Sequence, residues 1–111
     1  MTAQRITTGD GGTVPVACTL TPAGLAGRTG RWQRLAARAM TGRAQTADGL
    51  RLRFRPGPGV EEELRTLVAL ETECCPWADW VVETGAREVV LDVRAAGEEG
   101  VAALHGMFTG L

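Results

Sequence analysis

The sequence predicts an α+β fold: a two-layer sandwich with helices on one face of a mainly antiparallel sheet, in the order β-α-β-β-α-β-β-α. Three observations predict it. Segments whose apolar residues alternate, as in strands, are interleaved with segments whose apolar residues recur every three or four positions, as in helices. Two pairs of strand segments are joined by short turns, at Asp48-Gly49 and at Thr84-Gly85-Ala86, which is typical of antiparallel hairpins. The length of 111 residues suits one hydrophobic core.

The N-terminal part of the chain divides into a leader and a first strand. Residues 1–12 (MTAQRITTGDGG) are polar and glycine-rich, so we expect a flexible leader there and a single α+β domain over residues 13–111. A strand is expected over residues 14–20. Its alternate residues are apolar and share one face: Val14, Val16, Cys18 and Leu20. Cys18 is therefore expected to point into the core.

The first helix is expected to begin at Thr21-Pro22, a capping residue followed by proline at the first helical position. Its apolar positions mark one face: Leu25, Trp32, Leu35, Ala36, Ala39 and Met40. Beside this face runs a basic stripe: Arg28, Arg31, Arg34 and Arg38. We expect a solvated helix flank there, with a docking surface for an acidic partner as the alternative.

The remaining elements form two hairpins and two helices. Strands are expected over residues 43–47 and 50–55, with Leu50, Leu52 and Phe54 facing inward and three arginines facing outward as a polar sheet surface. A helix follows over 60–74, with three glutamates at its N-terminus that complement the helix dipole. The second hairpin joins a strand at Trp80–Glu83 to one at Glu88–Arg94, and a final helix covers residues 98–108.

The helix expected over residues 60–74 contains an acidic residue where an apolar one is expected. At about 100° per residue, Glu71 falls in the centre of an arc formed by apolar side chains: Leu64, Leu67, Val68, Cys74 and Cys75. Glu73 falls on the opposite face. A carboxylate in a core stripe is costly unless it is paired, hydrogen-bonded or protonated. Glu71 is therefore either paired with an arginine or backbone N–H groups at the edge of the core, or it acts as a ligand, a proton carrier or a hydrogen-bond partner of the thiols.

Two cysteines follow this carboxylate directly. Pro76 disfavours helical geometry at the preceding residue, so the helix should end near Cys74. A short helical turn from Pro76 to Trp80 would direct N–H groups at Cys75 and lower the pKa of its thiol. The three cysteines are an odd number, and two are adjacent, so we expect thiols in a cytoplasmic protein rather than a disulfide framework.

A soft-metal site follows if Cys18 meets Cys74 and Cys75 in the core. Three thiolates suit Hg(II), As(III), Cu(I) or, with a fourth ligand, Zn(II). His105, the single histidine, is the candidate fourth ligand. Trp77 and Trp80 would shield the site from water. The alternative is that the cysteines are small buried core residues.

The composition of the chain limits the classes of partner that we expect. The net charge of −1 gives no general attraction to nucleic acid or to anionic lipid. All twelve basic residues are arginine, and the chain lacks lysine and tyrosine. No apolar run approaches the roughly 18 residues of a membrane span, and no signal peptide is visible. We expect a metal ion or a small thiol-reactive ligand as the partner, and an exposed edge strand favours a homodimer.

The segment LETECCPW carries a resemblance, together with CTLTP at residues 18–22 and the LRLRF strand at residues 50–54. With these motifs the chain resembles a family of small bacterial domains that occur alone or appended to MerR-type transcription regulators, with an E-x-E-C-C-P-aromatic core. The resemblance covers most of the chain. Because many such regulators sense thiol-reactive metals, it implies metal-related chemistry.

Three functions stay open at this point. The first is a domain that binds or senses a soft metal or metalloid ion through Cys18, Cys74 and Cys75. The second is a thiol enzyme, such as an organomercurial-cleaving lyase in which Glu71 or Asp79 delivers the proton. The third is a non-catalytic interaction domain whose cysteines only pack.

Overall fold

The computed structural model describes residues 22–111. In chain order this part of the protein forms α1 (Pro22–Ala39), β1 (Met40–Thr46), β2 (Gly49–Phe54), α2 (Val60–Cys74), β3 (Ala78–Thr84), β4 (Val89–Ala95) and α3 (Glu98–Met107). The predicted α+β class is confirmed, with the order α-β-β-α-β-β-α. The predicted leader over residues 1–12 and the predicted strand over residues 14–20, which includes Cys18, lie outside the described residues.

The four strands form one antiparallel sheet in the order β1-β2-β4-β3. Both predicted hairpins are present, and β2 and β4 are the central pair. Leu50 lies opposite Val93 and Leu52 opposite Leu91, and all four side chains are buried. Because side chains alternate along a strand, this register aligns the apolar faces of both central strands toward the helices.

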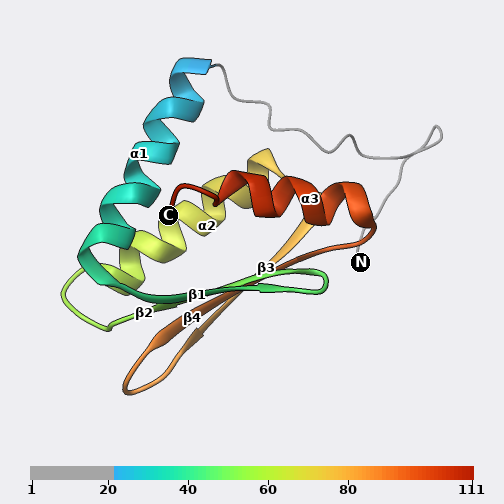
Figure 1. Ribbon diagram of the computed structural model, residues 1–111. Coiled ribbons are helices and arrows are strands. Elements are labelled where there is room, and N and C mark those ends of the chain that lie inside the picture. The colour runs from blue at the N-terminus through green and yellow to red at the C-terminus, as the bar shows by residue number, and fades with distance from the viewer. Residues whose placement is uncertain (1–21) are drawn as a thin grey trace.

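The helices cover one face of the sheet (Figure 1). Helix α1 packs against α2, and α3 lies over β2 and β4. The core between the layers contains residues from all three helices and from both central strands: Trp32, Leu35, Ala39, Leu50, Leu52, Phe54, Val60, Leu64, Leu67, Val89, Leu91, Val93, Ala95, Leu104 and Phe108. The C-terminal end of α2, the middle of α1 and the end of α3 therefore meet above the sheet.

The other face of the sheet carries polar side chains. The outward arginines of β2 are paired across strands: Arg51 Nε lies 2.8 Å from Asp92 Oδ1, and Arg53 Nη1 lies 2.9 Å from Glu88 Oε2. These partners agree with the polar sheet surface expected from the sequence. Exposed pairs of this kind contribute little to stability, because water and salt screen them. Across residues 22–111, no helix combines the length and the apolar character that a membrane crossing needs.

Candidate metal centre

The end of helix α2 brings Glu71, Cys74 and Cys75 into the core. The helix ends at Cys74, as Pro76 predicts, and Cys75 has a non-helical backbone (φ −126°, ψ 68°). The Cys75 N–H donates to the Glu71 carbonyl at 2.6 Å, and the Ala78 N–H donates to the Cys75 carbonyl at 3.2 Å. The chain thus passes from α2 into β3 through a tight turn. The helical turn expected from Pro76 to Trp80 does not form, because β3 already begins at Ala78.

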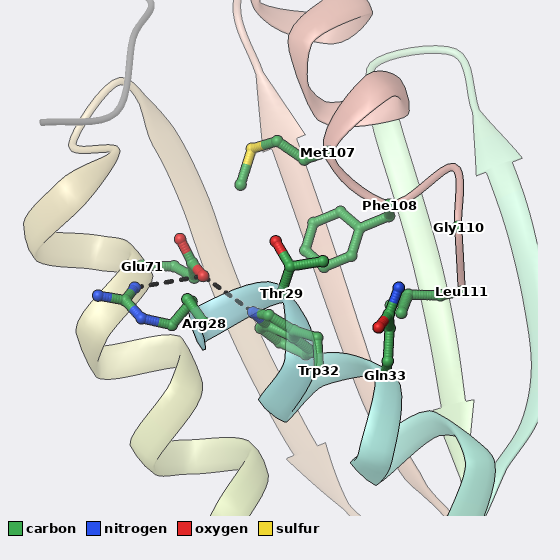
Figure 2. Close-up of a pocket in the computed structure, with 9 residues that line it drawn as sticks. All are labelled: Arg28, Thr29, Trp32, Gln33, Glu71, Met107, Phe108, Gly110 and Leu111. Atoms are coloured by element: carbon green, nitrogen blue, oxygen red, sulfur yellow. Dashed lines mark hydrogen bonds and ion pairs between the residues drawn. The ribbon is translucent and has the colours of Figure 1, made fainter. Parts of the chain in front are cut away.

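Glu71 is buried, with 4% of its side chain exposed, as its place in the apolar arc predicts. Two groups of α1 face its carboxylate (Figure 2). The Trp32 indole Nε1 donates to Glu71 Oε2 at 2.8 Å, and Arg28 Nη1 lies 3.3 Å from the same oxygen. The carboxylate is therefore both paired and hydrogen-bonded, which offsets much of its desolvation cost.

The burial of Arg28 contradicts one expectation from the sequence. The basic stripe of α1 predicts a solvated Arg28, yet only 11% of its side chain is exposed. The reason is spacing: Arg28, Trp32, Leu35 and Ala39 recur at intervals of three or four and lie on one helix face. That face packs toward α2, so the guanidinium meets the buried carboxylate. The same spacing is the signal that would have identified Arg28 from the sequence.

The two sulfur atoms lie close to the same carboxylate. Cys74 is 4% exposed and Cys75 is fully buried. One carboxylate oxygen of Glu71 and the sulfurs of Cys74 and Cys75 all lie within 4.8 Å of one another. Metal–sulfur bonds of about 2.3 Å allow two ligands of one ion to be up to about 4.6 Å apart. The three side chains could therefore hold a metal ion with small movements.

The surroundings of the two sulfurs do not favour thiolates in the metal-free protein. Desolvation by burial, followed by the charge of Glu71, raises the pKa of the Cys75 thiol from 9.0 to about 11, against a smaller lowering by Arg28. The expectation of a lowered thiol pKa is therefore wrong. Cys74 is disulfide-bonded, which also departs from the expectation of free thiols, whereas Cys75 is free. Metal binding here requires a reduced Cys74 and release of the Cys75 proton.

The other predicted ligands lie elsewhere or outside the described residues. Cys18 lies in the undescribed N-terminal part. His105 Nε2 lies 2.7 Å from the Gly49 carbonyl oxygen at the start of β2, and His105 does not belong to the group at the end of α2. Asp79 is exposed on β3 and lies outside that group as well.

The two tryptophans after the cysteines pack beneath the helices. Trp77 is partly buried, and a Cβ built on Gly100 of α3 would lie 3.7 Å from its ring. The Trp80 ring packs edge-on against Phe108, with 6.1 Å between ring centroids. The indole N–H groups of both tryptophans are buried without a hydrogen-bond acceptor among the described residues. Their observed role is packing.

Comparison with protein-family models, with curated proteins and with solved structures finds no match for this chain. The resemblance to the E-x-E-C-C-P domains therefore stays a prediction.

Proposed function

We propose that the reduced protein binds one thiophilic metal ion through the sulfurs of Cys74 and Cys75 and the carboxylate of Glu71. Cys18 is proposed as a further thiolate ligand. The observation that carries the proposal is the buried group of two sulfurs and one carboxylate oxygen within 4.8 Å of one another. Thiolates select soft or borderline ions, which favours Hg(II), Cu(I), As(III) or Zn(II) over Mg(II) and Ca(II).

The charges at the site limit which ion it can neutralise. The Arg28 guanidinium already offsets the Glu71 carboxylate. Two thiolates then carry two uncompensated negative charges, and a buried site is most stable when such charges are neutralised. A divalent ion such as Zn(II) or Hg(II) supplies that neutralisation. If Cys18 joins the set, a third thiolate shifts the preference toward trivalent As(III).

Binding is favoured over proton-donating catalysis at Glu71. Both groups that face Oε2 are hydrogen-bond donors, the Trp32 indole and the Arg28 guanidinium. Donors on both sides suit an oxygen that accepts, not an acid that must present a proton to a metal–carbon bond. The exposed position of Asp79 leaves the lyase alternative without a second buried acid among the described residues.

The test is a titration of the fully reduced protein with Zn(II), Hg(II), Cu(I) and As(III) under anaerobic conditions. Affinities are measured against a competing chelator, and thiolate coordination by charge-transfer absorption. We expect one ion per chain, bound at least about 100-fold more weakly after Cys75→Ala or Cys74→Ala. The oxidised protein should also bind weakly, because a disulfide sulfur is not a thiolate ligand.

Helix α2 also contains Glu73, which provides a matched control for removal of the Glu71 carboxylate. Glu71→Gln should weaken binding by about 10- to 100-fold, whereas Glu73→Gln, on the exposed face of the same helix, should leave it unchanged. A one-to-one complex whose affinity survives replacement of both Cys74 and Cys75 by alanine would exclude the site. Absence of any complex with the reduced protein would favour the alternative in which the cysteines only pack.

A further inference from the structure

A second feature lies on the α1 side of Glu71. A cavity of about 170 Å³ opens between α1, the end of α2 and the last residue of α3 with the segment that follows it (Figure 2). Its lining residues come from these three segments: Arg28, Thr29, Trp32, Gln33, Glu71, Met107, Phe108, Gly110 and Leu111. Of the described residues, neither Cys74 nor Cys75 lines it. Glu71 is the residue that the cavity and the candidate metal centre share.

One wall of the cavity is aromatic and aliphatic. Trp32 and Phe108 meet edge to face at 5.1 Å between ring centroids, and Met107 and Leu111 lie beside them. An apolar cavity of roughly 150 Å³ in another protein accepts benzene. The volume here therefore suits a ligand with a single ring or an aliphatic body of similar size.

The other end of the cavity is polar and electrically balanced. Arg28 Nη1 is buried and forms no hydrogen bond among the described residues, although it lies 3.3 Å from Glu71 Oε2 as an ion pair. The Arg28 Nη1 group, a donor without a hydrogen-bond acceptor among the described residues, therefore lies next to the Glu71 carboxylate, which is an acceptor. A ligand group that both accepts and donates hydrogen bonds matches this arrangement.

We propose that this cavity binds a small uncharged molecule that combines one ring-sized apolar body with a hydroxyl or primary amide group. The amide oxygen or hydroxyl oxygen accepts from Arg28, and its N–H or O–H donates to Glu71. A charged group is disfavoured because the ion pair is already neutral, so a carboxylate or ammonium would leave one buried charge uncompensated. The cavity and the ion pair carry this inference, and it does not depend on metal binding.

The experiment uses ligand titrations of the metal-free protein followed by the Trp32 indole N–H signal in ¹H–¹⁵N NMR spectra. Benzamide and benzyl alcohol are the probes, and benzoate and benzylamine are their charged counterparts. We expect both neutral probes to shift the Trp32 signal and to bind at least about tenfold more tightly than either charged counterpart. Equal or tighter binding of benzoate would overturn the proposal, as would the absence of any shift with the neutral probes.

Two glycines locate the binding site. A Cβ built on Gly110 would lie 3.8 Å from Gln33 Nε2 at the cavity, whereas a Cβ built on Gly106 meets nothing within 4 Å. Gly110→Leu should fill the cavity and weaken benzamide binding at least about tenfold, and Gly106→Leu should leave it unchanged. Unaltered binding in the Gly110→Leu protein would place the probe elsewhere and reject this site.

Removal of the carboxylate tests the charge argument. In the Glu71→Gln protein the Arg28 guanidinium loses its counter-charge, so the preference should invert and benzoate should bind more tightly than benzamide. Glu73→Gln, on the exposed face of the same helix, should keep the preference for benzamide. A folded Glu71→Gln protein that still prefers benzamide would contradict the role of the ion pair. If this variant does not fold, the Gly110→Leu comparison still decides the proposal.

Discussion

Alkaline pH should destabilise the metal-free protein through one residue, Cys75. Its thiol is fully buried, and burial together with the nearby Glu71 carboxylate raises its pKa from 9.0 to about 11. In the unfolded chain the thiol returns to its ordinary pKa. The folded state therefore holds the proton over a pH range in which the unfolded state has lost it.

The sign and size of the effect follow from this difference. A group whose folded pKa is raised contributes stability that is complete below pH 9.0 and is lost as the pH rises toward 11. One pKa unit corresponds to about 1.36 kcal/mol, so the free energy of unfolding should fall by about 2 kcal/mol between about pH 8 and about pH 10.5. The chain has no lysine and no tyrosine, so few other groups titrate in that range.

The slope of the free energy of unfolding against pH can be measured by urea unfolding at a series of pH values, with a chelator present and without reductant. In the Cys75→Ala protein the slope should disappear, whereas the level of stability should drop by a constant amount because a small cavity remains. The titration can also be followed directly by the ultraviolet absorbance of the thiolate, which no tyrosinate obscures. A wild-type protein as stable at about pH 10.5 as at about pH 8 would refute the argument.

Two further predictions concern stability and use matched pairs of residues. Trp32→Phe should cost about 1–3 kcal/mol more than Trp80→Phe in urea unfolding, because the Trp32 indole donates to buried Glu71, whereas the Trp80 indole has no acceptor within residues 22–111. Equal losses would show that this hydrogen bond adds nothing. Gly49→Ala should lower the free energy of unfolding by at least about 2 kcal/mol more than Gly42→Ala does, because a Cβ at Gly49 would overlap a carbonyl oxygen of β4. A Gly49→Ala protein as stable as Gly42→Ala would mean that the sheet can shift locally.

Much of the fold could be predicted because its signals are local. Alternation in Leu50, Leu52 and Phe54 fixes which face of β2 is buried, and all three side chains are buried. Pro76 fixes the end of α2 at Cys74 through a steric effect on its neighbour. The burial of Glu71 also follows from local spacing, since a helix repeats every 3.6 residues.

The partners of Glu71 could not be predicted in the same way. They depend on how α1 lies against α2, and the sequence separation between Trp32 and Glu71 is 39 residues. His105 illustrates the same limit: the sequence predicts its helix, but the contact with the Gly49 carbonyl depends on where α3 crosses the sheet. The raised pKa of Cys75 likewise results from burial and from a carboxylate whose place is set by tertiary packing.

Because Glu71 belongs to both proposed sites, metal binding and ligand binding should oppose each other. A metal ion that draws the carboxylate toward Cys74 and Cys75 removes the acceptor that faces Arg28 in the cavity. Benzamide should therefore bind the Zn(II)-loaded reduced protein at least about fivefold more weakly than the metal-free reduced protein, and thermodynamic linkage requires benzamide to weaken Zn(II) binding by the same factor. Both factors can be measured by calorimetry on the reduced wild-type chain, with Gly110→Leu as the variant in which the coupling should vanish while Zn(II) still binds. If each ligand binds and neither affects the other, the carboxylate is not shared, and the metal must be held by the sulfurs without Glu71.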